Sequence, residues 1–148
     1  MGMSTINEIA GLVARLQNEK LALIHRTETQ QKMHEEYIDE VLADFIQVVD
    51  TFEWAESVIK ERGLDQSQVS TKAITRLLTA KTKALAVLEK YGVKRIELPD
   101  QMIDDQLCVI VGSERDSAQR PGTIVSVEKN GYTRDGRLLR AAEVIVVR

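Results

Sequence analysis

Residues 37–59 read YIDEVLADFIQVVDTFEWAESVI, and their apolar spacing is the strongest indication of the fold. Its apolar residues recur at steps of three and four, which places them in two adjacent rows along a helix. The rows consist of Tyr37, Ile38, Val41, Leu42, Phe45, Val48, Val49, Phe52, Ala55, Val58 and Ile59. A stripe this broad can meet more than one neighbouring helix, so the stretch predicts a helix that packs in a bundle.

Glycine and proline mark where the helical part of the chain is interrupted. From residue 12 to residue 91 the only glycine is Gly63, and there is no proline. Because these two residues interrupt helices most strongly, we predict one helix over about 5–62 and a second over about 67–91. Candidate N-terminal caps are Ser4 and Thr5 for the first helix, and Ser67 and Ser70 for the second.

The second predicted helix is also apolar on one side. Its apolar residues are Val69, Ala73, Ile74, Leu77, Leu78, Leu85, Leu88 and Tyr91. Two such helices per chain, paired with those of a second copy, form a four-helix bundle. We therefore predict a homodimer, with an interface that includes Phe45, Val48, Val49, Phe52, Leu77 and Leu78.

The first predicted helix is too long for a single chain of this size to bury, and its N-terminal part shows a coiled-coil spacing. The apolar seam comprises Ile6, Ile9, Val13, Leu16 and Leu23. Polar residues continue the same seam at Thr27, Gln30 and His34. Either this weak segment separates first on heating, or its polar residues fix the register of the two helices.

After Gly92 the apolar pattern changes to a period of two, which is typical of strands. Candidate strands are 94–98, 107–111, 123–128 and 142–147, and the pairs Asn130-Gly131 and Asp135-Gly136 are tight-turn signals. The predicted fold class is α+β. It comprises a coiled-coil helix at 1–36, dimerisation helices at 37–91 and a small β domain at 92–148.

Composition excludes several classes of partner and location. The net charge is −3 and the isoelectric point about 5.5, so neither nucleic acid nor an anionic membrane is an expected partner. No apolar run approaches the ~20 residues of a membrane span, and the N-terminus lacks a signal-peptide pattern. A single cysteine indicates a reduced cytoplasmic or organellar protein, and we predict the cytoplasm.

Catalytic chemistry is not expected either. The two histidines, His25 and His34, are nine residues apart, whereas a zinc site needs several converging ligands at shorter spacing. Cys108 lies in the apolar run LCVIV, which favours a small buried side chain over a nucleophile. No phosphate-binding glycine loop is present. We predict no catalytic residue, no metal and no cofactor, and hence a protein that is not an enzyme.

Trp54 lies off the best apolar row of its helix. It therefore sits either at the edge of the bundle, which we favour, or against a partner, since tryptophan is enriched in both places.

Three segments, in the same order along the chain, carry a resemblance to the GrpE family. The tail PGTIVSVEKNGYTRDGRLLRAAEVIVV, 121–147, resembles the family's C-terminal signature. The segment VVDTFEWA, 48–55, is similar to the family's bundle helix, and KYGV, 90–93, to its junction with the β domain. The resemblance covers about residues 37–148 and identifies a divergent member.

This resemblance implies a co-chaperone: an adenyl-nucleotide exchange factor that promotes ADP release from a DnaK-type chaperone. The family's β domain binds the nucleotide-binding domain of the chaperone and rotates one lobe outward, and no bond is made or broken. Residues that match family contacts are Arg137, Val146, Ile103, Val58 and Lys32.

The chain departs from the family pattern at residues 104–110. The family has Asp-Pro-Asn-x-His-Glu-Ala there, whereas this chain reads DDQLCVI, so only the first Asp is retained. Trp54 replaces a basic residue of the bundle segment, and Glu128 stands where a contact is often apolar. The alternative function is a dimeric scaffold or adaptor that keeps the fold without exchange activity.

Overall fold

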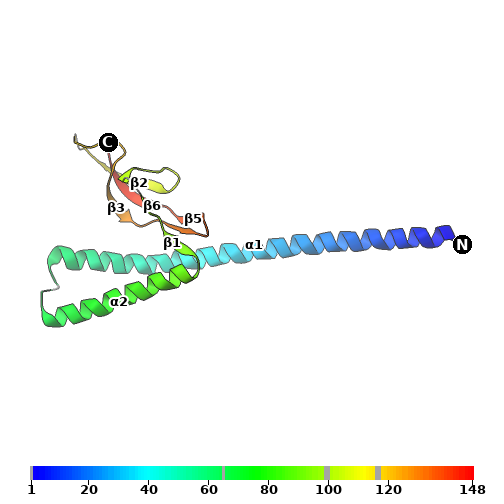
Figure 1. The fold of residues 1–148 in the computed structure, drawn as a ribbon, viewed down its shortest axis with the longest axis horizontal. Helices are drawn as coiled ribbons and strands as arrows, with labels where there is room; N and C mark the ends of the chain where they lie inside the picture. Colours follow the sequence, from blue (N-terminus) through cyan, green and yellow to red (C-terminus); the bar gives the residue numbers. More distant parts are fainter. Residues whose placement is uncertain (1, 65, 99–100, 116–117) are drawn as a thin grey trace. The chain divides into compact units, whose positions relative to one another are not determined.

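A computed structural model describes residues 2–64, 66–98, 101–115 and 118–148. The helices are α1 (Gly2–Arg62) and α2 (Gln68–Lys90), and the strands are β1 (Val93–Arg95), β2 (Cys108–Glu114), β3 (Ile124–Lys129), β4 (Tyr132–Arg134), β5 (Arg137–Arg140) and β6 (Ala142–Val147) (Figure 1). The prediction of an α+β chain with two helices followed by small sheets is confirmed. The chain divides into two compact units, Met1–Glu40 and Val41–Arg148, and α1 runs through both.

Helix α1 ends where its sequence meets a glycine. Gly63 adopts a φ of +58°, and the backbone N–H of Leu64 donates to the carbonyl of Ile59 at 3.1 Å, which closes the last turn. The predicted cap at Ser4 or Thr5 is wrong, because the helix already includes both residues. Ser4 Oγ instead donates to the Glu8 carboxylate one turn later, at 3.4 Å.

The N-terminal unit leaves its apolar seam exposed. Ile6, Ile9, Leu16 and Leu23 are each more than half exposed in the single chain. Of the helices that the structure describes, neither is both long and apolar enough to cross a membrane.

Helix α2 begins at the predicted cap. Ser67 Oγ accepts a hydrogen bond from the backbone N–H of Ser70 at 3.1 Å. The helix ends at Lys90, and Gly92 follows with a φ of +78°. Figure 1 shows α2 alongside the later part of α1, and the carboxylate of Glu56 on α1 pairs with Lys81 on α2 at 2.5 Å.

Glu56 gives this helix pair an acid-sensitive ion pair. Hydrogen bonds from Lys81 and then Lys60 lower the pKa of the Glu56 carboxyl from 4.5 to about 2. A carboxyl whose pKa is lower in the folded state stabilises the fold above about pH 4.5, and that stability is lost as the pH falls towards 2.

We therefore expect Glu56→Gln to remove part of the pH dependence of unfolding between pH 4.5 and 2. Wild type should lose more stability over this window than the variant, as followed by urea unfolding at a series of pH values. Glu61→Gln, at an exposed position on the same helix, is the matched control. Parallel pH profiles for wild type and Glu56→Gln would show that these ion pairs do not contribute.

The described β part of the chain forms two three-stranded sheets, with strand orders β1-β4-β5 and β2-β6-β3. The pair Asp135-Gly136 forms the predicted tight turn between β4 and β5, with φ values of +49° and +80°. The prediction of a tight turn at Asn130-Gly131 is wrong, because neither residue has a positive φ and the chain passes there from one sheet to the other.

The core of the second sheet lies around its central strand. Strand β6 pairs parallel with β2 and antiparallel with β3. The buried cluster consists of Cys108, Ile124, Ala142, Val144 and Val146, with Leu98, Ile103 and Leu107 packed against it. The prediction that Cys108 is a small buried residue is confirmed, since only 6% of it is exposed.

Candidate partner-binding site

Arg137 lies at the start of β5, directly after the tight turn, and its side chain is exposed. The turn is held against the end of the helical part, because Asp135 N–H donates to the carbonyl of Gly92 at 3.3 Å. A side chain at Gly92 would collide with the Asp135 carboxylate, which lies 2.4 Å from the position of an added Cβ. Gly92 and Gly136 both have a positive φ, which allows the backbone path that leads into β5, and Arg137 is the first residue of that strand.

Ile103 and Val146 lie together, but not with Arg137. Ile103 is half-buried and packs against the core cluster that contains Val146. Val146 is only 5% exposed, so it acts as a core residue and is not available as a direct contact in this conformation. Arg137 belongs to the other sheet.

The two helical contact candidates lie in different units of the chain. Val58 is half-buried on α1 within Val41–Arg148. Lys32 lies within Met1–Glu40, where its exposed ammonium pairs with Glu36 at 3.8 Å.

The residues predicted to form the dimer interface differ in their solvent exposure in the single chain. Val48 is 47% exposed, and the half-buried members are Phe45, Phe52, Leu77 and Leu78. Val49 is fully buried in the single chain together with Leu42 and Ile46, so it belongs to the core of the protomer.

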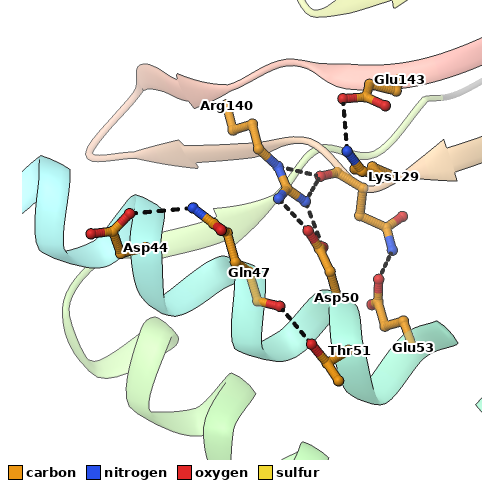
Figure 2. A network of polar contacts seen from close by, with 9 residues as sticks. Asp44, Gln47, Asp50, Thr51, Glu53, Lys129, Arg140 and Glu143 are labelled. Atoms are coloured by element: carbon orange, nitrogen blue, oxygen red, sulfur yellow. Dashed lines mark hydrogen bonds and ion pairs between the residues drawn. The ribbon is translucent and has the colours of Figure 1, made fainter. Parts of the chain in front are cut away.

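A polar network that the sequence alone does not reveal attaches the β domain to α1 (Figure 2). The guanidinium of Arg140 donates to both oxygens of the Asp50 carboxylate, at 2.6 and 2.7 Å. It also donates to the carbonyl of Asn130, from Nε at 3.2 Å and from Nη2 at 2.7 Å. Arg140 and Asp50 are each about one-fifth exposed, so the pair is shielded from much of the solvent.

Asn130 connects three elements at once. Its Nδ2 donates to the Glu53 carboxylate on α1 at 2.6 Å, and its Oδ1 accepts from Arg95 on β1. The backbone carbonyl of Asn130 accepts hydrogen bonds from Arg140 of β5. Asn130, which lies between β3 and β4, therefore uses its side-chain nitrogen, its side-chain oxygen and its backbone oxygen in these contacts.

Tyr132 fills the space behind this network. It is 2% exposed, and its ring centre lies 5.6 Å from the guanidinium carbon of Arg140. Burial, together with the nearby Glu53 carboxylate, raises the pKa of the Tyr132 phenol to about 12. The phenol therefore stays neutral across the physiological range.

Strand β2 exposes apolar side chains on the β domain. It lies at an edge of its sheet, and its successive residues Val109, Ile110 and Val111 are each about half exposed. Two of them fall in the divergent segment 104–110. The β-branched run was visible in the sequence, but its exposure depends on the strand order.

The described residues contain no group of three or more histidine, cysteine or acidic side chains arranged to hold a metal ion.

Comparison with known proteins extends over nearly the whole chain. The sequence model of the GrpE family matches residues 4–148, which include both helices and both sheets. The chain belongs to the GrpE family. The match begins well before residue 37, so it also takes in the N-terminal helix.

Individual relatives place the chain among distant members of the family. A "Protein GrpE" of Paramagnetospirillum magneticum is 26% identical over 151 residues, which are 97% of this chain and 74% of the relative. A "Protein GrpE" of Pseudomonas aeruginosa is 27% identical over 140 residues, or 91% of this chain and 69% of the relative. One from Porphyromonas gingivalis is 32% identical over 109 residues, which are 73% of this chain and about half (54%) of the relative.

Proposed function

We propose that this chain is an adenyl-nucleotide exchange factor that promotes ADP release from a DnaK-type chaperone in the cytoplasm. The observation that carries the proposal is the GrpE family match over residues 4–148, which spans the helices and the β domain together. The chain acts by binding alone. To release ADP it must bind the open, nucleotide-free chaperone more tightly than the ADP-bound one, because only a difference in affinity shifts an equilibrium.

The proposed chaperone-binding surface lies on the β domain, 92–148. Arg137 supplies an exposed cation on a fixed turn, and the edge of β2 supplies apolar area through Val109, Ile110 and Val111. Ile103 of the same domain is an additional proposed contact, and Val58 and Lys32 on α1 are proposed contacts outside this domain. Val146 contributes indirectly, by packing beneath the surface.

The proposed active form is a homodimer. The seam within 1–36 exposes several large aliphatic side chains, and a row of this kind is typically covered by a second helix. The segment 37–91 is the proposed bundle, in which Phe45, Val48, Phe52, Leu77 and Leu78 face the second copy.

Release of a fluorescent ADP analogue from DnaK-type chaperones tests the proposal directly. Adding the protein should accelerate release in a concentration-dependent way, and the protein alone should hydrolyse no nucleotide. Binding to the chaperone without accelerated release would instead indicate the scaffold or adaptor. No binding to any DnaK-type chaperone would contradict both functions.

Arg137→Ala is expected to weaken chaperone binding about tenfold, as an arginine in the centre of an interface often does. Its melting curve should stay nearly unchanged, because substitutions at exposed positions usually alter stability by less than about 0.5 kcal/mol. Binding is measured by titration of labelled chaperone. Arg120→Ala, at another exposed position of the β domain, is the control and should bind like wild type. Equal binding by the two variants would remove Arg137 from the site.

A further inference from the structure

Among the described residues, two regions that attach the β domain to the helices lie apart from each other. One is the chain itself, which passes from α2 into β1, the strand that packs closely against α2 in the described part of the chain. The other is the polar network on α1, where Asp50 and Glu53 lie three residues apart and so share one face of the helix (Figure 2). A single connection leaves a domain free to turn about it, whereas a second, separate attachment fixes its orientation.

The contact between Arg140 and Asp50 is suited to fixing an orientation. Two parallel hydrogen bonds between a guanidinium and a carboxylate, at 2.6 and 2.7 Å, require the two planar groups to stay nearly coplanar. The other side of the guanidinium is held by the Asn130 carbonyl. A lysine in place of Arg140 would keep the positive charge but could not form the two parallel hydrogen bonds to the Asp50 carboxylate.

The contact between Asn130 and Glu53 adds a second point on the same helix face. Asn130 is itself held within the β domain by hydrogen bonds from Arg95 of β1 and Arg140 of β5, so its contact with Glu53 links both strands to α1. The two contacts therefore resist both separation and rotation. We call these four residues, Asp50, Glu53, Asn130 and Arg140, the joint.

We propose that the joint is a positioning device that sets the β domain at a fixed orientation on α1, and that this orientation lets the chain discriminate between the two states of the chaperone. The second half of this inference rests on the proposed function. A binding surface with a fixed orientation fits one conformation of the chaperone better than the other. A β domain that turns freely can adapt to both conformations, so the affinities for the nucleotide-free and the ADP-bound chaperone become more alike.

The first measurement tests the orientation without any chaperone. Spin labels are attached to Lys83→Cys on α2 and Ser113→Cys on β2, in a Cys108→Ala background that removes the native thiol. The distance between the two labels reports how the β domain lies on the helices. Excess unlabelled protein ensures that only distances within one chain are measured. Wild type should give a narrow distance distribution. Arg140→Lys should broaden it, and Asp50→Asn serves as a second variant in case the first fails to fold.

The matched control is Glu143→Gln. It removes an ion pair of 3.2 Å with Lys129 between β6 and β3, so it takes a charge from the neighbourhood of Arg140 while leaving the hydrogen bonds between Arg140 and Asp50 in place. This variant should keep the narrow distribution. An unchanged distribution in both joint variants, or equal broadening in the control, would overturn the proposal.

The second measurement tests the link to exchange. For each protein the affinity for nucleotide-free chaperone is divided by the affinity for ADP-bound chaperone. Joint variants should lower this ratio about tenfold, within the range of typical coupling between two ligands. Glu143→Gln should preserve it, and melting curves should show that all variants remain folded. A variant that is only less stable would have a lower melting temperature. Its folded molecules would still show the wild-type ratio of the two affinities.

The two measurements separate the two ideas. A ratio of one for wild type would reject the proposed function, and the distance distribution would still decide whether the joint fixes the domain. A broadened distribution with an unchanged ratio would reject the role of the joint in discrimination.

Discussion

Gly131→Ala is expected to unfold the β domain under conditions in which wild type is stable. A methyl group at this position would lie 2.6 Å from the backbone nitrogen of Ala142 and 2.7 Å from Cδ1 of Ile96. The Ile96 side chain can turn aside. The nitrogen cannot, because it donates to the carbonyl of Leu107 at 2.9 Å where β6 enters the centre of its sheet. Overpacking usually costs about 1–3 kcal/mol, and a clash with fixed backbone should reach or exceed that range.

Gly112→Ala is the matched control in the same sheet. Its added methyl group would meet the Ile145 side chain at 3.3 Å, and a side chain can shift by a few tenths of an ångström. Both variants are followed by urea unfolding, with amide NMR signals of the β domain read separately from the helical circular dichroism. Gly131→Ala should lose the β signals at lower urea than Gly112→Ala. Similar midpoints for the two would show that the chain relaxes around Gly131.

The helical part was predictable because local rules decide it. Gly63 ends α1 and Ser67 caps α2 through contacts within a few residues, so the sequence pattern is sufficient. The start of α1 was misplaced because Ser4 can either cap a helix or lie within one. Nothing local decides between the two when the preceding residues are also compatible with a helix.

Four strands of the β domain were predictable from the sequence, but β4 and β5 were missed, and so was the way the strands pair into sheets. The run at β2 and the run at β6 were both found, yet their parallel pairing depends on how the chain crosses between them. Asn130-Gly131 has the composition of a hairpin turn, but its glycine is required for space, next to Ala142 and Ile96, and not for a positive φ. Val146 matches a family contact in sequence. In the structure it pairs with Ile124 across β6 and β3, and it lies in the core of the sheet.

The joint connects two segments that lie far apart in the sequence. Asp50 lies in the segment 48–55 and Arg140 in the segment 121–147, the two longest segments that carry the resemblance to the family. They are 90 residues apart, and no spacing rule connects them. Their bidentate contact brings the two segments together in the folded chain.

Phe45 and Phe52 provide the prediction with the largest effect on assembly. They lie seven residues apart on one side of α1 and are both half-buried in the single chain, which leaves apolar ring surface for a second copy to cover. Truncating a fully buried aromatic residue to alanine costs about 3–5 kcal/mol. Part of that cost falls on the single chain, so we expect the double variant Phe45→Ala/Phe52→Ala to raise the dimer dissociation constant by at least about a hundredfold.

The measurement is light scattering over a range of protein concentrations, with circular dichroism to verify that the helices remain. Trp54→Ala is the control, because it removes a larger aromatic ring from the same helix at a position that is 68% exposed and off the apolar row. It should remain a dimer at concentrations where the double variant is a monomer. If the double variant stays dimeric and Trp54→Ala dissociates, the interface lies on the Trp54 side of α1, and the second copy covers the tryptophan that we place at the edge of the bundle.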